Sequence, residues 1–398
     1  MQLKHGMNLK HFTLLAFALT VLVVTSTDIY IASLPALVVY FKTTPNLVNL
    51  TLSVYTLSTA LFVLFIGVMS NRFGRKKMLI IGLLIFLISS FVIALANSIW
   101  LVIFFRAGQA YGSASLLLTC RLIIKDTMNL QEQIHTAGIL IMGVVFAPVA
   151  PSIGALLAKC FGWQGGFLFS GFCACFSLIA VLCIIKETNS TPITRLGSFS
   201  SYLQEYWTLL FERRCVYLVL IIALTFAVHF VFIGISSYLF INKVGMSPLH
   251  YSYLFMLLAL GYLIGNILMM WLNRQNMPPL QLISLGVLVS VLGLFILGLS
   301  LTFSYGIYLT ILVMLGVLIM RLAAGFIIVP AEIELMYHFG QQSAQVLGLA
   351  TCIQFVLASV VITLAGLFHA QPKYGLAIIM TICFVPVIFL NFKLKRLS

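Results

Sequence analysis

Three charged side chains stand inside long apolar runs of the sequence. Asp28 interrupts a run that begins at Phe12, and Arg106 and Arg321 each follow an apolar stretch of their own. The chain holds 398 residues but only 8 Asp and Glu, and Asp28 is the acid that lies deep within such a run. A charge removed from water must pair with another charge or face a polar cavity, where it can bind a solute or carry a proton. These residues therefore predict solute or proton binding away from bulk water.

The depths of Asp28 and Arg106 are comparable if both runs are helices. At a rise of about 1.5 Å per residue, Asp28 lies about 20 Å from Phe41 and Arg106 about 14 Å from Asn97. Burial disfavours an ionised carboxylate and a neighbouring arginine favours it, so a change between these surroundings would bind and release a proton. We expect Asp28 to carry the proton and Arg106 to be its partner or modulator. The alternatives are a purely structural ion pair, and an Arg106 that extends to the outer surface.

The elements that must position these residues are membrane-spanning helices. Hydrophobic residues make up 62% of the chain and charged residues 8%, which leaves too little polar surface for a soluble globule. Apolar runs of about 20 residues, long enough to cross a bilayer as a helix, recur along the chain. We read the first as a retained helix and not a signal peptide. The predicted fold is an all-α membrane protein with twelve transmembrane helices in two six-helix bundles, at 12–40, 46–69, 78–96, 99–124, 134–158, 164–185, 215–241, 249–272, 280–303, 305–331, 343–368 and 374–392.

A polar stretch separates the first six helices from the last six. We predict an N-terminal six-helix bundle at 1–185, a cytoplasmic linker at 186–214 and a C-terminal six-helix bundle at 215–398. Most of the 22 Lys and Arg residues fall in the predicted inner loops, whereas the outer loops hold only Lys42, Lys159, Lys243 and Lys373. This asymmetry predicts a multi-pass protein of the inner (plasma) membrane with both termini in the cytoplasm. The net charge of +14 is thus a sign of orientation and does not indicate nucleic-acid binding.

Three motifs resemble signatures of the major facilitator superfamily. GVMSNRFGRKK at 67–77 resembles its loop between helices 2 and 3, and RAGQAYGSA at 106–114 resembles its helix 4 pattern. APSIGA at 150–155 resembles the helix 5 signature of its antiporters. The resemblance assigns a gating role to Gly67, Asn71, Arg72, Gly74, Arg75, Gln109, Pro151 and Gly154. Asn71 stands where the family usually has aspartate, so we expect a latch that is weaker or depends on hydrogen bonds.

The first apolar run resembles the signature of one subfamily. TDIYIASLP at 27–35 is similar to TDxYLPxLP of the bicyclomycin-resistance (Bcr/CflA) drug-efflux subfamily, and the residues that agree are Thr27, Asp28, Tyr30, Leu34 and Pro35. The resemblance implies a proton-coupled antiporter that exports small amphipathic organic compounds by alternating access, with cargo bound between the two halves. Two alternatives are an exporter or importer of an endogenous anionic metabolite such as a carboxylate siderophore, and a membrane receptor that transports nothing.

Polar residues near helix centres are the candidates for cargo binding, although each could instead serve helix packing. They are Tyr30, Tyr55, Ser58, His229, Tyr238, Asn266, Arg321 and Gln354. Arg321 has no acid within four residues, so we expect it to face cargo or water and to favour neutral, zwitterionic or anionic cargo over lipophilic cations. The alternative is an arginine held by backbone carbonyls at a helix break near Gly316 or Gly325. For His229 the alternative is a hydrogen-bonded core residue.

The sequence contains no nucleotide-binding loop, metal-ligand cluster or nucleophile triad. We therefore predict neither enzyme activity nor a cofactor or metal. The 8 cysteines are scattered, almost all in or at the edge of predicted helices, so no disulfide framework is expected. The expected partners are a small-molecule substrate, protons and membrane lipids, and we expect the protein to act as a monomer.

Overall fold

The computed structural model describes residues 8–128, 132, 136, 139–140, 149–189, 207–339 and 343–396. The elements of these ranges are helices, and the chain divides into two compact units, Met1–Thr43 with Val54–Leu196 and Thr44–Ser53 with Gly197–Ser398. Eleven segments of the described ranges are long and apolar enough to cross a membrane. Twelve were predicted, and the difference lies in the fifth, 134–158, which is described continuously only from residue 149 and is counted together with the sixth in Ala150–Ile184.

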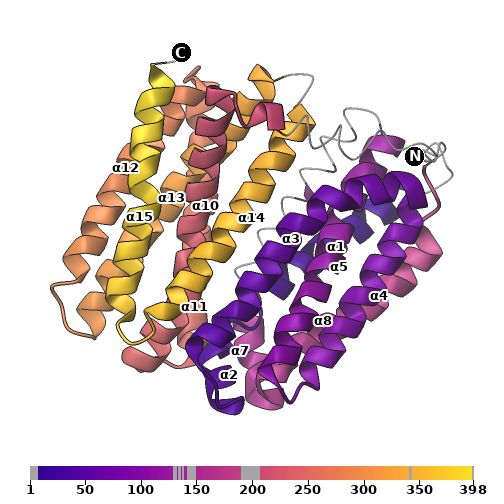
Figure 1. The fold of residues 1–398 in the computed structure, drawn as a ribbon, viewed down its shortest axis with the longest axis horizontal. Helices are drawn as coiled ribbons and strands as arrows, with labels where there is room; N and C mark the ends of the chain where they lie inside the picture. The colour runs from indigo at the N-terminus through magenta and orange to yellow at the C-terminus, as the bar shows by residue number, and fades with distance from the viewer. Residues whose placement is uncertain are drawn as a thin grey trace. The chain divides into compact units, whose positions relative to one another are not determined.

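The helices of the first unit pack around a core of apolar side chains. In Figure 1, α4, α5 and α8 lie side by side, and Phe12, Phe86 and Leu116 are among the side chains buried between α1 and these helices. The elements that lie in this unit, wholly or in part, are α1 Leu9–Asp28, η1 Ile31–Ser33, α2 Leu34–Tyr40, α3 Pro45–Phe73, α4 Arg75–Ala94, α5 Ile99–Thr127, α7 Ala150–Phe161, η3 Gly162–Gln164 and α8 Gly165–Ile184.

The first predicted span, 12–40, is confirmed as one candidate membrane span, Lys10–Tyr40, but its helix is broken and not continuous. α1 ends at Asp28, the short η1 follows, and α2 begins at Leu34 with Pro35 in its first turn. A proline has no N–H and its ring clashes with the carbonyl four residues earlier, so an α-helix cannot run unchanged through residues 31–35. Gly154 of α7 packs against this break, where a Cβ would overlap the carbonyl oxygen of Ile29. The break leaves Asp28 at a helix end inside the span.

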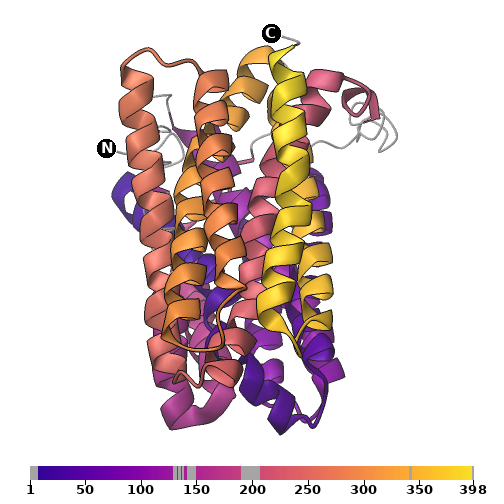
Figure 2. The same ribbon diagram turned by 90° about the vertical axis from the view of Figure 1, so that its left-hand side faces the viewer.

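The second unit also consists of packed helices. Pro248, Pro279 and Pro372 are the first residues of α11, α12 and α15, a position at which the missing N–H costs nothing. Figure 2 shows the yellow α15 beside other helices of this unit, and it packs against α10 and α12. The helices are α10 Arg213–Ser237, the π-helical η4 Tyr238–Lys243, α11 Pro248–Arg274, α12 Pro279–Ser300, α13 Ile307–His338, α14 Ser343–Leu367 and α15 Pro372–Lys395.

The first turns of α3, Thr44–Ser53, belong to the second unit. Asn49 is fully buried there, and its amide donates to the carbonyl oxygens of Gly234 in α10 at 2.9 Å and Ile362 in α14 at 3.4 Å. Ser359 of α14 donates to the carbonyl oxygen of Ser53 at 2.9 Å. These bonds satisfy polar groups that have no water to bind, so they tie the start of α3 to α10 and α14.

Candidate functional site

Arg106 lies in the interior of the first unit and does not extend to the surface. Its side chain is the largest of the fully buried side chains, at 0% exposure. The guanidinium carbon is 4.1 Å from the ring centre of Tyr55, 4.7 Å from that of Tyr30 and 6.0 Å from that of Phe167. A desolvated cation over aromatic faces gains about 2 kcal/mol or more from each good contact. Rings from α3, α8 and the turn between α1 and η1 thus surround the positive charge that α5 carries.

Hydrogen bonds fix the orientation of this guanidinium. Arg106 Nη1 donates to Gln109 Oε1 at 2.9 Å and to the carbonyl oxygen of Ser26 at 3.3 Å. Gln109 in turn donates through Nε2 to Ser90 Oγ at 2.7 Å. Tyr55, one of the rings that surround Arg106, is also held by a hydrogen bond, because its hydroxyl donates to Ser113 Oγ at 2.8 Å. Gln109, matched on the family motif, therefore positions Arg106 directly.

Asp28 lies at the same place in the unit. It is the last residue of α1, two residues after the Ser26 carbonyl that Arg106 binds, and the residue as a whole is 8% exposed. Its neighbour Thr27 donates to the hydroxyl of Tyr55 at 3.4 Å. The structure therefore brings Asp28, Tyr30, Tyr55 and Arg106 to one corner, which we call the Arg106 corner. Sequence reasoning missed the hydroxyl partners, because serines are common in helices and nothing in their spacing marks them.

A second cluster of predicted residues lies in the second unit. The guanidinium carbon of Arg321 on α13 lies 4.8 Å from the ring centre of Tyr262 on α11. The ring of His229 on α10 lies 5.6 Å from that of Phe230 and 6.2 Å from that of Phe255. Asn266 lies one turn beyond Tyr262 on α11 and donates to its carbonyl oxygen at 2.8 Å. α13 runs without interruption through Gly316 and Gly325, so there is no helix break at either glycine. Tyr262 was not predicted, although its place four residues before Asn266 would have put both on one helix face.

Three cargo candidates remain. Ser58 is half-buried on α3 and Gln354 is buried on α14. Tyr238 is buried at the start of η4, and its hydroxyl donates to Asn49 Oδ1 at 3.4 Å. Tyr238 therefore belongs to the hydrogen-bonded group that holds the start of α3 against α10 and α14.

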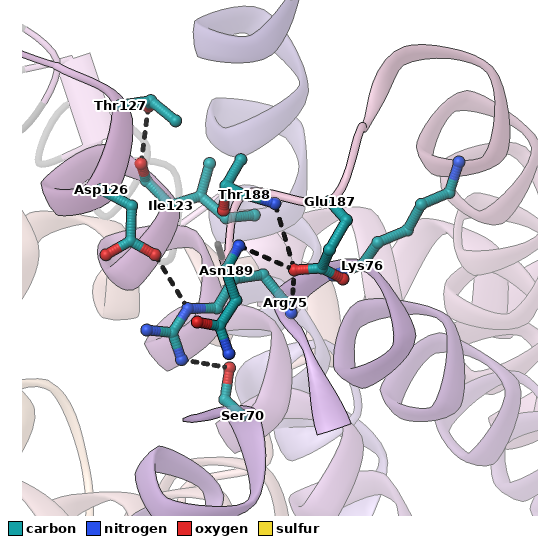
Figure 3. A network of polar contacts seen from close by, with 9 residues as sticks. All are labelled: Ser70, Arg75, Lys76, Ile123, Asp126, Thr127, Glu187, Thr188 and Asn189. Atoms are coloured by element: carbon teal, nitrogen blue, oxygen red, sulfur yellow. Dashed lines mark hydrogen bonds and ion pairs between the residues drawn. The ribbon is translucent and has the colours of Figure 1, made fainter. Parts of the chain in front are cut away.

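The loop between α3 and α4 turns at Gly74. Gly74 has φ +96°, a conformation that favours glycine, and a Cβ at this position would collide with the carboxylate of Glu187. That carboxylate accepts from the backbone N–H groups of Arg75 at 2.8 Å and Lys76 at 3.2 Å, the first residues of α4 (Figure 3). It also accepts from Thr188 and Asn189, so Glu187 caps α4 and fixes the chain that follows α8.

The side chain of Arg75 connects this loop to α5 and to the end of α3. Its Nε donates to Asp126 Oδ2 of α5 at 2.9 Å, and its Nη1 donates to Ser70 Oγ of α3 at 3.0 Å. Asn71 was expected to make the latch weaker or dependent on hydrogen bonds, and in the structure Arg75 has a carboxylate partner in Asp126. Sequence reasoning missed both Asp126 and Glu187, because an acid in a polar loop shows no partner until the fold is known.

The other gating candidates are placed as follows. The side chain of Asn71 and the surroundings of Gly67 lie outside the described residues. Arg72 is exposed, with its guanidinium carbon 5.4 Å from the ring centre of Phe73. Pro151 lies in the first turn of α7, one turn before Gly154, which packs on the α1–η1 break. The helix 5 motif therefore contacts the segment that carries Asp28.

The family model described as the Major Facilitator Superfamily matches residues 16–363. This chain belongs to that superfamily. It is therefore a multi-pass membrane transporter of small molecules and not an enzyme. Among the described residues, no group of three or more His, Cys, Asp or Glu side chains could hold a metal ion.

Several curated relatives are similar to this transporter over part of its length. An uncharacterized transporter of Rickettsia bellii is 25% identical over 274 residues, 68% of this chain and 67% of the relative. The multidrug resistance protein MdtL of Vibrio parahaemolyticus is 26% identical over 245 residues, 61% of each chain. MdtL of Salmonella paratyphi C is 27% identical over 246 residues, 61% of this chain and 62% of the relative. The matches to the MdtL proteins thus span less than two thirds of those relatives.

Solved structures share the fold of this transporter at low identity. A D-xylose-proton symporter superposes with a TM-score of 0.74 at 14% identity, covering 94% of this chain and 96% of that chain. A peptide transporter superposes with a TM-score of 0.75 at 13% identity, covering 98% and 94%. With the eleven candidate spans, these neighbours show an all-α membrane protein of the major facilitator fold.

Proposed function

We propose that this transporter is a proton-coupled antiporter of the inner membrane that exports small amphipathic organic compounds by alternating access. The observation that carries the proposal is the buried Asp28 at the end of α1, beside the Ser26 carbonyl that holds Arg106. Burial favours the neutral carboxyl group and the guanidinium favours the ionised one. A small movement at the α1–η1 break changes the balance between them, and this is what coupling to a proton requires.

The direction of transport rests on similarity. The MdtL relatives are named as multidrug resistance proteins, and the motif around Asp28 resembles that of a drug-efflux subfamily. The helix 5 motif resembles that of antiporters, and its Gly154 packs on the segment next to Asp28. Both similarities support export in exchange for protons.

The protein acts as a monomer with both termini in the cytoplasm. The loop between α3 and α4, which Glu187 and Asp126 hold, has the gating role.

A second candidate function keeps the fold and changes the cargo. The guanidinium of Arg321, which lies over the ring of Tyr262 in the second unit, suits an endogenous anionic metabolite such as a carboxylate siderophore. A receptor that transports nothing needs no titratable acid at this depth.

The test is proton flux in vesicles reconstituted with the full-length protein. An internal pH dye is followed when ethidium, chloramphenicol or 2-naphthoate is added, as a cationic, a neutral and an anionic probe. We expect at least one probe to move protons through the wild type, and the Asp28→Asn variant to lose that response. Glu212→Gln is the matched control, because Glu212 is an exposed acid at the start of α10. If the wild type moves no protons with any probe, or if Asp28→Asn retains the full response, the proposal is wrong.

A further inference from the structure

Phe167 of α8 packs against the Arg106 corner. The residue is 1% exposed, and its ring centroid lies 5.0 Å from that of Tyr30. The same ring lies 6.0 Å from the guanidinium carbon of Arg106, which is itself 4.7 Å from the ring of Tyr30. Phe167, Tyr30 and Arg106 thus form a closed group in which each side chain contacts the other two. Because such packing leaves little free space, the position of the Phe167 ring limits where the other two can lie.

Trp163 in η3 is the next ring beyond Phe167. Its ring centroid lies 6.1 Å from that of Phe167, 5.4 Å from that of Tyr40 and 5.2 Å from that of Phe41. Trp163 is 5% exposed, and its indole Nε1 is buried and makes no hydrogen bond to any described residue. A buried N–H group without a partner costs free energy. The contacts that hold Trp163 in this place are therefore those of its ring.

These rings contact both ends of the segment that follows α1, residues 29–41. Tyr30 lies at its start, directly before η1, and packs on Phe167. Tyr40 is the last residue of α2, near the end of the segment, and packs on Trp163. Phe167 and Trp163 therefore determine the path of the chain directly after the end of α1, where the acid of the Arg106 corner lies.

Few ionisable groups reach this end of α1. α1 packs against α5, α7 and α8. α8 carries no charged residue, and Lys159 of α7 is exposed in the last turn of that helix. Among the described residues, the ionisable side chains with contacts at this corner besides Asp28 are Tyr30, Tyr55 of α3 and Arg106 of α5. Arg106 is therefore the cation whose position matters most for the charge of Asp28.

We propose that Phe167 and Trp163 are positioning residues of the proton-coupling site, which set the pH at which Asp28 binds a proton. Phe167 holds Tyr30 against the guanidinium of Arg106, and Trp163 holds Phe167. With both rings in place, Arg106 stays at the end of α1, where its charge favours the ionised carboxylate. This inference rests on the proposed antiport and concerns how the coupling carboxyl group of that antiport is tuned.

The test is a pH titration of the Asp28 carboxyl group by difference infrared spectroscopy of the purified full-length protein. The signal of Asp28 is the protonated-carboxyl band that the Asp28→Asn variant lacks. Phe167→Leu keeps an apolar side chain but removes the ring, so Arg106 is held less firmly and the ionised carboxylate loses support. We expect the midpoint of the titration to rise by about 0.5 to 1 pH unit. A midpoint that stays or falls while the Tm drops would mean that Phe167 only packs the core, and would overturn the proposal.

Two variants of Trp163 separate its ring from its N–H group. Trp163→Phe keeps a ring against Phe167 and removes the buried N–H, so we expect the wild-type midpoint. Trp163→Leu removes the ring and should raise the midpoint, which provides a test if Phe167→Leu fails to fold. Phe176→Leu is the matched control, because Phe176 is 72% exposed on the same helix and should leave the midpoint unchanged. Equal rises in the control and the ring variants, or in both Trp163 variants, would contradict a role of the rings.

The titration and the proton flux of vesicles can fail separately. If the midpoint shifts as expected while wild-type vesicles show no proton flux with any probe, the proposed antiport fails and the positioning role stands. If vesicles exchange a probe for protons while Phe167→Leu titrates like the wild type, the positioning role fails and the antiport stands. If the wild type has no carboxyl band that Asp28→Asn lacks, Asp28 does not titrate and the positioning role is wrong.

Discussion

The buried guanidinium of Arg106 is the centre of a group of polar and aromatic side chains inside the first unit. Arg106 stacks on Tyr55 and Tyr30 and binds Gln109 and the Ser26 carbonyl. We predict that Arg106→Lys lowers the free energy of unfolding by about 1–3 kcal/mol, because an ammonium group keeps the charge but cannot stack and hydrogen-bond in this geometry. Thermal unfolding in detergent measures the change, with the exposed Arg274→Lys as control. An unchanged Tm would show that the stacking contributes nothing.

Arg75 and Asp126 allow a sharper test of the loop at the start of α4. Arg75 is nearly buried, with a side-chain exposure of 7% against 24% for Asp126. We predict that Asp126→Asn costs about 1–3 kcal/mol because it removes the carboxylate from a desolvated cation. The double variant with Arg75→Gln should cost less than the sum of the single changes, as a double-mutant cycle of unfolding measures. Additive costs would mean that the pair does not interact in solution.

At the scale of elements, glycines at the contacts between helices determine how closely two helices approach each other. In α11, a Cβ at Gly265 would overlap the carbonyl oxygen of Leu322, whereas Gly298 of α12 has nothing within 4 Å of a built Cβ. We predict that Gly265→Ala destabilises the protein by about 1–3 kcal/mol through strain at the crossing. Gly298→Ala should be neutral or stabilise it by up to about 1 kcal/mol, since alanine is the better helix former. Equal effects on the Tm would contradict close contact between α11 and α13.

The elements also mark the limits of what the sequence predicts. Helices were predictable because lipid leaves a long apolar run no other way to satisfy its backbone. The break after Asp28 was not, since the residues beyond it remain apolar and Pro35 is compatible with a helix start. The buried position of Arg106 could be expected from the cost of a charge in lipid, but its rings and hydroxyl partners come from other helices. The capping role of Glu187 could not be predicted either, because its four backbone N–H partners lie on two separate segments.

At the scale of the whole molecule, the charge distribution predicts the topology. Lys42, Lys159, Lys243 and Lys373 alone among the lysines and arginines fall in predicted outer loops, so the positive-inside rule places both ends inside. Reporters that are active only in the cytoplasm, fused to either terminus of the full chain, should both be active. An inactive C-terminal fusion in a well-expressed protein would mean an odd number of spans.

The central claim is that Asp28 couples transport to protons, and counterflow measures it most directly. The probe that the wild type exchanges for protons is loaded unlabelled into vesicles, and labelled probe is added outside, first without and then with a pH gradient. We predict that Asp28→Asn retains counterflow, because cargo exchange needs no net proton movement, and loses accumulation driven by the gradient. If Asp28→Asn accumulates the probe as the wild type does, Asp28 is not the coupling site; if it also loses counterflow while its Tm is unchanged, Asp28 serves cargo binding instead.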